Sequence, residues 1–525
     1  MRRRPPESKI ISLVVSEYAD KMGMDRDDSE QCWFDPIKKT RPAKRLSQLT
    51  PAANPSIPKT FDGVQRAELV CLFCDRSFWR APACTDPESI VAGRASDRGV
   101  PCLARACLVA VPAIDPWDSD AMTGGHPALE ILAWLLALLA AFGTVLSVAG
   151  AVAVHRFASR ARAPSRQYPA ITVLKPLCGD EPRLDEALAT ICRQSYAGPI
   201  QIVFGVQDAS DPALLAVRRL QARFPDHDIA VATDGRRHGP NRKICNLINM
   251  LPLARHDVLV FSDSDLHVPP DYLERIVAAL QVPGTGLVTT LCAGLPTVRG
   301  MAAQLGATYT SHSFLPAVLL SRLLGRQDCL GTTMALRRDT LEDIGGLHAL
   351  VSHLADDNVL GQRVRSLGLQ VRLADTIAAA GVPHASLRAL WLHELRWART
   401  IRALQPMGFA ASAVQFPLFW AALAVVPAGG ASWSVGLFAF VWSIRFVATQ
   451  WIDRLLRRLQ VPEAAVAIWH LPLRDMVSVA AVAASFLGNR VVWRGHTLVA
   501  DNGRAVPPRV ETYAMTAADP ANATV

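Results

Sequence analysis

Residues 131–154 carry no charged side chain and are mostly apolar. A helix rises about 1.5 Å per residue, so this stretch would be about 36 Å long, enough to cross the hydrocarbon core of a bilayer, which is about 30 Å thick. The stretch is too long for the core of a signal peptide, and no basic cluster comes close before it. It therefore predicts an uncleaved membrane anchor, which we place at residues 126–156.

Arginines indicate on which side of the membrane the neighbouring segments lie. Four arginines follow the anchor at positions 156–166, and basic residues favour the cytoplasmic side, so we expect the next domain in the cytoplasm. Two further apolar segments, residues 409–428 and 433–447, are followed by three more arginines. We therefore predict membrane helices within residues 407–490. The last apolar stretch, 476–488, is short for a full crossing, and the sequence leaves open whether it crosses, re-enters or lies at the interface.

The composition agrees with a membrane-associated protein. Charged residues make up 19% of the 525, below the proportion of about a quarter that is typical of soluble domains, and half of the chain is apolar. The net charge of +9 is spread along the chain, and no basic run is dense enough to indicate a nucleic-acid partner. The 11 cysteines show no spacing typical of a disulfide framework, which favours a reduced cytoplasmic setting.

Residues 1–121 differ from the rest of the chain, because they are rich in Pro, Arg and Asp and show no sustained helical or strand period. Cys71 and Cys74 form one C-x-x-C pair, whereas a zinc site needs a second pair at a suitable spacing. We leave this segment unassigned and interpret it as disordered, or as translated sequence upstream of a true start at Met122. We also expect the C-terminal segment, residues 491–525, to end in a disordered tail.

Residues 168–402 predict a cytoplasmic α/β domain, because strand patterns alternate with helix patterns. Short apolar runs predict strands at residues 171–174, 200–206, 229–233 and 258–261, and amphipathic runs predict helices at residues 184–192, 212–224 and 244–253. This alternation implies a mostly parallel sheet that binds its ligands at the carboxyl ends of the strands.

Two carboxylates follow the predicted strand at residues 258–261. Asp263 and Asp265 lie in the sequence FSDSDLHVPP, and alternation along an extended chain points both to the same side. Carboxylates this close repel each other unless a cation lies between them, and their hard oxygens suit Mg²⁺ or Mn²⁺ completed by substrate phosphates. The alternative is a solvated Asp/Ser turn after a strand.

Two other junctions between strands and helices offer groups for a nucleotide. Asp208 ends a strand in GVQDASDPA, where its carboxylate can accept hydrogen bonds from a base or a ribose. The alternative is an N-cap for the next helix, although Ser210 or Asp211 suits that role better. Lys243 closes the basic loop RRHGPNRK before a helix, a position that suits a diphosphate, although such a loop alone is usually solvated.

A general base is predicted where the helical stretch at residues 359–367 begins. Asp356 can cap this helix, which leaves Asp357 to project into a cleft and take a proton. In the helical stretch WLHELRWART, the side chains of His393, Arg396 and Trp397 share one face. An indole and a guanidinium there can pack against an acceptor and a diphosphate, and the alternative is an interfacial helix at the lipid headgroups.

In this order the motifs resemble those of membrane-bound processive-type and ceramide-glucosyltransferase-like glycosyltransferases, whose pattern is three aspartate sites followed by [Q/R]-x-x-R-W. The matching segments are Asp208, Asp263-x-Asp265, Asp357 and HELRW at 393–397, with KPL at 175–177, GPNRKICNL and CLGTTMALRRDTLEDIGG. The resemblance covers about residues 130–500. It looks closest to the hopanoid-biosynthesis glycosyltransferases of bacteria, on the segments FGVQD, RRHGPNRKICNLINMLP, LADD and HELRWARTIR. His393 stands where many relatives have Gln or Arg, and Asn358 where an aromatic residue is common.

The resemblance implies a GT-A-like α/β fold with N-terminal and C-terminal transmembrane helices, in the bacterial inner membrane, multi-pass, with the catalytic domain facing the cytoplasm. It implies inverting transfer of N-acetylglucosamine from UDP-GlcNAc to the hopanoid bacteriohopanetetrol; the alternatives are ceramide with UDP-glucose, or another lipid acceptor. The implied catalytic residues are Asp357, Arg396, Trp397 and His393. The implied contacts to the UDP-sugar are Lys175, Pro176, Asp208, Lys243 and Asp263, and Asp265 with Asp263 would hold Mg²⁺ or Mn²⁺.

Two other classes of function fit the sequence less well. A catalytically silent membrane scaffold predicts the loss of a carboxylate from one of the three aspartate sites, and none is lost. A small transporter would carry charge pairs inside its apolar segments, to form a path for its substrate. The apolar segments of this sequence contain Arg445 and no charge pair.

Overall fold

The computed structural model of the chain describes residues 126–160, 164–462, 466–493, 496–501 and 504–506. The predictions for residues 1–121 and for the tail after residue 507 fall outside this part of the chain. All elements below belong to one compact unit, Ile114–Val525.

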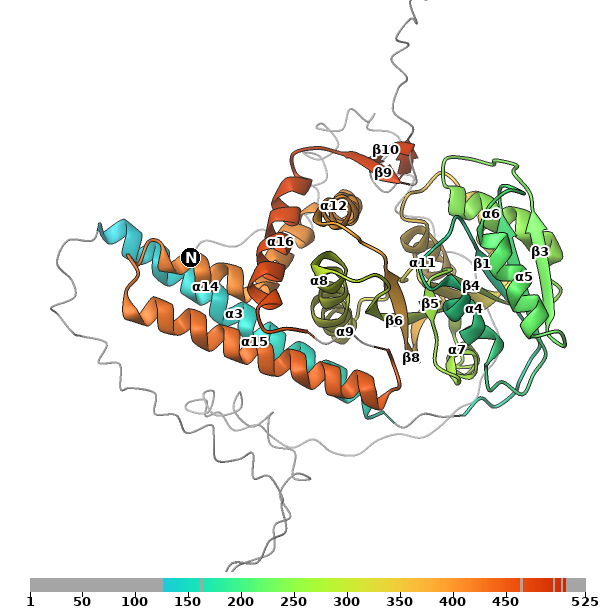
Figure 1. Ribbon diagram of the computed structural model, residues 1–525, viewed down its shortest axis with the longest axis horizontal. Coiled ribbons are helices and arrows are strands. Elements are labelled where there is room, and N and C mark those ends of the chain that lie inside the picture. Colours follow the sequence, from blue (N-terminus) through green and yellow to red (C-terminus); the bar gives the residue numbers. More distant parts are fainter. Residues whose placement is uncertain (1–125, 161–163, 463–465, 494–495, 502–503, 507–525) are drawn as a thin grey trace, which may run out of the picture. The chain divides into compact units, whose positions relative to one another are not determined.

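One eight-stranded sheet organises the soluble domain (Figure 1). Its strands are β1 (Ile171–Pro176), β2 (Ile200–Val206), β3 (Asp228–Thr233), β4 (Val258–Ser262), β5 (Leu266–His267), β6 (Thr285–Pro296), β7 (Thr333–Arg337) and β8 (Gln370–Val382). They lie in the order β3-β2-β1-β4-β7-β6-β8-β5. The four strands expected from apolar runs are β1 to β4.

The prediction of a mostly parallel sheet is right for one half of it. Strands β3, β2, β1 and β4 run parallel to one another, as do β6 and β8. Strand β7 runs antiparallel to both β4 and β6, and β5 runs antiparallel to β8, so the whole sheet is mixed. No strand was predicted at β5 to β8, and an apolar run carries no information on the direction of a strand, so the reversal was missed.

Helices cover both faces of the sheet. Those next to the parallel half are α4 (Leu184–Cys192), α5 (Ala213–Arg223) and α6 (Arg242–Met250). Helix α7 (Tyr272–Leu280) packs mainly on β8 and β6, and α10 (Arg338–Asp343) and α11 (Asp356–Ser366) come later in the chain. Successive residues of β1 point to opposite faces, so Val173 packs in one core cluster with Leu188, and Leu174 in the other with Ile244. This burial on both faces explains why the strand has no polar alternation.

Two helices among the described residues are long and apolar enough to cross a membrane, α3 (Pro127–Ala158) and α15 (Ser432–Arg458). The predicted anchor lies in α3. A third crossing exists if the pair Pro406–Gln415 and Pro417–Val425, bent by 69°, is one span. This pair comprises α13 (Pro406–Ala411), the 3₁₀ turn η6 (Ser412–Gln415) and α14 (Pro417–Val425). Pro417 lacks the N–H that a continuous helix uses, which accounts for the break.

Helices α3, α14 and α15 lie side by side (Figure 1). A Cβ atom at Gly143 of α3 would lie 2.3 Å from the carbonyl oxygen of Val414, so only glycine permits this close approach. Between the sheet and these helices lie α8 (Met301–Tyr309), the π-helical turn η4 (Thr310–Phe314), α9 (Leu315–Leu323) and α12 (Leu387–Leu404).

The stretch at residues 476–488, which the sequence left open, lies mostly in α16 (His470–Ser485). This helix is not among those that meet the length and apolarity of a membrane span within the described residues, and it buries Arg474 and Asp475 in its first turns. After it come three antiparallel strands that the sequence did not predict, β9 (Arg490–Trp493), β10 (His496–Asp501) and β11 (Arg504–Val506).

Candidate active site

A large cavity opens where the carboxyl ends of β1, β2 and β4 face α11 and α12. Its volume is about 1240 Å³, which exceeds the range of about 300–1,000 Å³ that is usual for one small ligand. Nine of the ten predicted site residues line it, namely Pro176, Asp208, Lys243, Asp263, Asp265, Asp357, His393, Arg396 and Trp397. The cavity is therefore large enough for two substrates to meet.

Asp263 and Asp265 lie in the turn between β4 and β5 and not on the strand itself. Because the chain is not extended here, strand alternation does not explain how the two side chains point, although both do line the cavity. Burial, together with the carboxylates of Asp263 and Glu181, raises the pKa of Asp265 to about 7. Glu181 also accepts a hydrogen bond from the hydroxyl of Ser264.

This group of oxygens fits a hard divalent cation. Three carboxylates interact at one place, and their mutual repulsion contributes to the raised pKa of Asp265. Carboxylate oxygens are the ligands that Mg²⁺ and Mn²⁺ prefer. No set of three His, Cys, Asp or Glu side chains within the described residues is arranged to hold a metal by itself. Asp263 and Asp265 would therefore hold a cation together with oxygens from a substrate.

Lys175 lies beneath the Asp263 turn and does not line the cavity, contrary to its predicted contact with the nucleotide sugar. Its side chain is 1% exposed, and its Nζ donates to Ser262 Oγ at 3.0 Å and to the carbonyl oxygen of Asp263 at 2.7 Å. Burial lowers the pKa of Lys175 to about 8, against the opposing effect of Asp265 and Asp263. Lys175 therefore supports the shape of the turn from below.

Lys243 lines the cavity beside the same turn. Its Nζ pairs with Asp263 Oδ1 at 2.7 Å and donates to the carbonyl oxygen of Gly331 at 2.8 Å. Burial alone would lower the pKa of Lys243, but Asp263 and Asp356 raise it above its ordinary value. The ammonium group is therefore charged at neutral pH and lies where an anionic ligand beside Asp263 would meet it.

Asp356 does not cap α11, which corrects the role expected from the sequence. The residue before the helix is Ala355, and α11 has no side-chain cap. Asp356 is 8% exposed, and its Oδ1 accepts from the amide of Asn241 at 3.0 Å, while no described residue donates to its Oδ2. Burial raises the pKa of Asp356, although Lys243 and Asn241 partly oppose the rise. Asp356 thus joins the start of α11 to the loop before α6.

Asp357 lines the cavity, as expected for a general base. Its Oδ1 accepts from the backbone N–H of Asn358 at 2.7 Å. A Cβ atom at Gly331 would lie 3.0 Å from Asp357 Oδ2, so glycine there leaves this oxygen room. Burial, together with the neighbouring Asp356, raises the pKa of Asp357 to about 7. Such a carboxyl group can exchange a proton near neutral pH.

Asp208 is held in a tight local turn at the end of β2. Its Oδ1 accepts from the N–H and the hydroxyl of Ser210, at 2.8 and 2.7 Å, and these bonds lower its pKa. Asp211 is the residue that caps the next helix, because its Oδ1 accepts from the N–H of Ala213 at 2.9 Å. The carboxylate of Asp208 is thus not used as the helix cap and faces the cavity.

His393, Arg396 and Trp397 form one face of α12 that lines the cavity. The imidazole of His393 packs in a tilted arrangement against Trp397, at 4.9 Å between ring centroids, and against His384, at 4.6 Å. Burial, together with Arg396 and His384, lowers the pKa of His393 to about 3, so it is neutral at pH 7. Phe314 faces Trp397 with 6.0 Å between their ring centroids.

Sequence reasoning missed three residues of this site. Asn241 caps α6 by accepting from the N–H of Ile244 and also donates to Asp356, and the Asn before an amphipathic helix was a signal for the cap. Glu181 and His384 line the cavity from the loops that follow β1 and precede α12. For these two no local pattern was available, because only the folded chain brings them to the site.

The sequence matches Glycosyl transferase family 21 over residues 132–506. Ceramide glucosyltransferase 1 of Caenorhabditis elegans is 20% identical over 243 residues, 46% of this chain and 52% of that protein. The ceramide glucosyltransferase of Gibberella zeae is 28% identical over 167 residues, 29% of this chain and 32% of that protein. The chain thus spans about half or less of the length of these curated relatives.

Among solved structures, the mannosyltransferase PcManGT from Pyrobaculum calidifontis, in complex with GDP-Man and Mn²⁺, aligns with a TM-score of 0.39 and 18% identity. The alignment covers 68% of this chain and 99% of that one. The S. aureus TarS fragment 1–349 in complex with UDP-GlcNAc aligns with a TM-score of 0.29 and 13% identity, over 64% and 98% of the two chains.

Proposed function

This chain belongs to glycosyl transferase family 21, and from that premise we propose that it transfers a sugar from a UDP-sugar to a membrane lipid. The observation that carries the proposal is one cavity with a carboxylate-rich end and an apolar, aromatic end. A charged, water-soluble donor suits the first end, and the hydrocarbon part of a lipid suits the second.

The donor would occupy the end formed by the strands. Asp208 would accept hydrogen bonds from the uridine, because its carboxylate is already oriented by Ser210. Lys243 would contact the diphosphate, beside a cation held by Asp263 and Asp265. Pro176 would form part of the wall of this end.

The acceptor would occupy the end formed by η4, α9 and α12. Apolar side chains line both sides of it at helical spacing, Phe314 and Val318 on one side and Trp397, Ile401 and Leu404 on the other. Side chains four residues apart share a face, so these residues form a short apolar strip on each side, with the polar Ser321, Arg322 and Thr400 beside them.

Exposed apolar side chains lie where α9 and α12 end. Leu323 and Leu324 are 62% and 84% exposed, and Met407 just after α12 is 81% exposed. Large apolar side chains exposed together mark a surface that meets lipid or another partner. A lipid acceptor could therefore reach the cavity from the bilayer at this end, which agrees with a site on the cytoplasmic face of a bacterial inner membrane.

In the proposed reaction Asp357 takes the proton of the acceptor hydroxyl, and the acceptor oxygen attacks the anomeric carbon as its bond to UDP breaks, with inversion. The guanidinium of Arg396 stabilises the negative charge that develops on the diphosphate. Trp397 and the neutral His393 pack against the hydroxyl-bearing part of the acceptor and keep water away from it. A bound Mg²⁺ or Mn²⁺ supplies electrostatic stabilisation of the same diphosphate charge.

We further propose that the donor is UDP-GlcNAc and the acceptor a hopanoid, bacteriohopanetetrol, on the strength of the motif resemblance. The second candidate is UDP-glucose with ceramide, which is favoured by the names of the curated relatives.

The two candidates are separated by one experiment. The protein in lipid vesicles is incubated with labelled UDP-GlcNAc or UDP-glucose, and with bacteriohopanetetrol or ceramide in each case. We expect label in the lipid fraction from UDP-GlcNAc and the hopanoid. Label on ceramide from UDP-glucose would support the alternative, and transfer to neither lipid would contradict a lipid glycosyltransferase of either kind.

A further inference from the structure

A buried ion pair joins α12 to α16. Arg474 is the largest side chain that is fully buried within the described residues. Its Nη1 and Nη2 donate to Glu394 Oε1 and Oε2, both at 2.6 Å, and Glu394 is 7% exposed. Two parallel hydrogen bonds of this kind fix the orientation of both groups as well as their distance.

The other contacts of Arg474 extend the pair to a third helix. Its Nε donates to Ser478 Oγ at 3.1 Å on α16, and Nη1 also donates to the carbonyl oxygen of Leu305 on α8 at 3.4 Å. The guanidinium carbon lies 5.3 Å from the ring centroid of Tyr309, also on α8. Arg474 therefore holds α8, α12 and α16 together at one point.

Stability alone is a poor explanation for such a pair. Removing two charges from water costs free energy that their attraction often does not recover, and apolar side chains of similar size can serve a core equally well. A buried, bidentate pair does, however, define one relative placement of the two helices. The helix that it places is the one that carries the HELRW motif.

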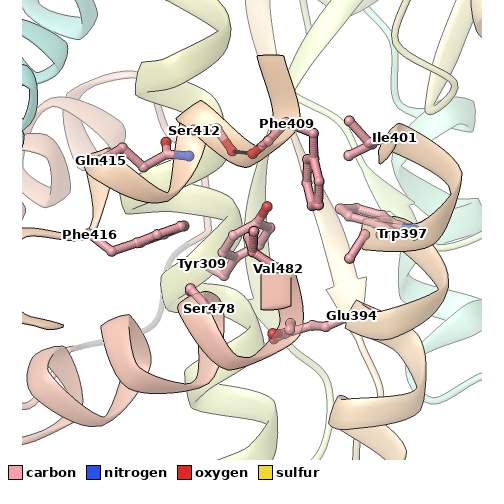
Figure 2. A pocket seen from close by; sticks show the side chains of 12 residues that line it. Tyr309, Glu394, Trp397, Ile401, Phe409, Ser412, Gln415, Phe416, Ser478 and Val482 are labelled. Atoms are coloured by element: carbon pink, nitrogen blue, oxygen red, sulfur yellow. Dashed lines mark hydrogen bonds between the residues drawn. The ribbon is translucent and has the colours of Figure 1, made fainter. Parts of the chain in front are cut away.

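Glu394 lies within that motif, directly after His393. Glu394, Arg396 and Trp397 lie on one helix, so any rotation of α12 that moves Glu394 also moves the other two side chains. Figure 2 shows Glu394 and Trp397 on the same helix, with Glu394 reaching towards the helix that carries Ser478. Both side chains line the large cavity as well as the small chamber drawn there.

The partner helix α16 is itself held on its other side. Asp475 Oδ2 accepts from the N–H of Leu418 in α14 at 3.1 Å, and its Oδ1 lies 3.7 Å from Arg445 Nη2 in α15. Within α16, Asp475 thus contacts the apolar helices α14 and α15, and its neighbour Arg474 contacts α12, which lines the cavity of the candidate active site.

We propose that Glu394 is a positioning residue, which through Arg474 fixes the rotation of α12 so that His393, Arg396 and Trp397 face the cavity. This proposal rests on the proposed function. Its consequence is that the C-terminal helix α16, which contributes no predicted catalytic group, controls the rate of the reaction.

The test compares Glu394→Gln with the double variant Glu394→Leu/Arg474→Met in lipid vesicles. For each variant, kcat with bacteriohopanetetrol is expressed per UDP-GlcNAc binding site, so that unfolded protein in the sample does not lower the value of kcat. We expect the dissociation constant for UDP-GlcNAc to stay within about twofold, because the donor end does not touch α16. We expect kcat to fall at least about tenfold, since a small misplacement of reacting groups can cost about 10²-fold.

The double variant separates positioning from stability. It leaves no unpaired buried charge, so its Tm should be equal to or above that of the unsubstituted protein even if Glu394→Gln does not fold. If the pair only stabilises the fold, the double variant will have normal kcat per binding site, and this result would overturn the proposal. Low kcat at normal Tm supports it.

The buried pair His312–Asp453 offers a matched control. Its side chains are 2% and 3% exposed, His312 Nε2 lies 2.6 Å from Asp453 Oδ1, and neither residue lies on α12 or α16. Asp453→Asn should change Tm and, because His312 lies in η4 at the acceptor end, any effect on the reaction should fall on the acceptor KM and not on kcat per binding site. An equal loss of kcat there would overturn a specific role for Glu394. Absence of transfer by the unsubstituted protein would instead contradict the proposed function.

Discussion

Replacing Asp357 with asparagine should remove the general base and leave the donor site intact. The new side chain has the same size, and its oxygen can still accept the hydrogen bond that Asp357 Oδ1 receives from Asn358 at 2.7 Å. General-base catalysis contributes about 10²–10⁴-fold, so kcat should fall by at least about 10²-fold, which corresponds to about 2.7 kcal/mol. The affinity for UDP-GlcNAc should change little, because the base acts on the acceptor.

Loss of folded protein cannot produce this result. The pKa of Asp357 is raised to about 7 by burial and by Asp356. A carboxyl group with a raised pKa favours folding below its unfolded pKa and loses that contribution as pH rises through about 7. The neutral amide in Asp357→Asn avoids this loss, so the Tm of the variant at pH 8 should be equal to or higher than that of the unsubstituted protein.

The assay measures kcat per UDP-GlcNAc binding site from pH 5.5 to 8.5. For the unsubstituted protein kcat should rise with pH as Asp357 loses its proton, with a midpoint at about 7, and Asp357→Asn should lack this rise. Asp356→Asn is the matched control: it removes the neighbouring charge, keeps an oxygen for Asn241, and should keep kcat within about tenfold. Turnover close to normal in Asp357→Asn would refute the assignment.

Three further predictions concern the two ends of the cavity. Chelation of divalent cations should abolish transfer and added Mg²⁺ or Mn²⁺ restore it, and Asp265→Asn should weaken metal-dependent binding of UDP-GlcNAc; full activity in excess EDTA would contradict this. Lys243→Met removes the ammonium group beside Asp263 and should raise the donor KM at least about tenfold. Arg236 is an exposed arginine of the same loop, and Arg236→Ala should leave the donor KM unchanged. Val318→Trp fills the apolar end and should raise the acceptor KM without changing donor affinity, as measured by titration with UDP-GlcNAc; an unchanged acceptor KM would place the lipid elsewhere.

The local pattern of apolar and polar residues was sufficient to predict the strands of the parallel half of the sheet. Helix α4 and strand β2 have the predicted bounds, because amphipathic and apolar periods are properties of short segments. The direction of β7 depends on the path of the chain between distant strands, and no short segment records that path. The same limit explains why the mixed sheet was not foreseen.

The sequence indicated which residues form the site, but it did not indicate most of the contacts between them. Asp263, Asp265 and Asp357 were found because carboxylates beside strand or helix ends have a recognisable chemistry. The role of Asp356 was wrong, because its partner Asn241 lies 115 residues away in the chain. Lys175 was expected at the UDP-sugar because of the motif resemblance, whereas the fold buries its side chain beneath the turn.

The central claim is that one cavity joins a UDP-sugar to a membrane lipid, and the most direct test counts both products of the same reaction. The protein in vesicles is given UDP-GlcNAc labelled in the sugar, and the UDP released is compared with the label recovered in lipid, with and without bacteriohopanetetrol. UDP release should depend on the presence of the lipid, and one labelled sugar should be recovered in the lipid for each UDP that is released. Release of UDP with all of the sugar left in water, with or without lipid, would contradict the central claim.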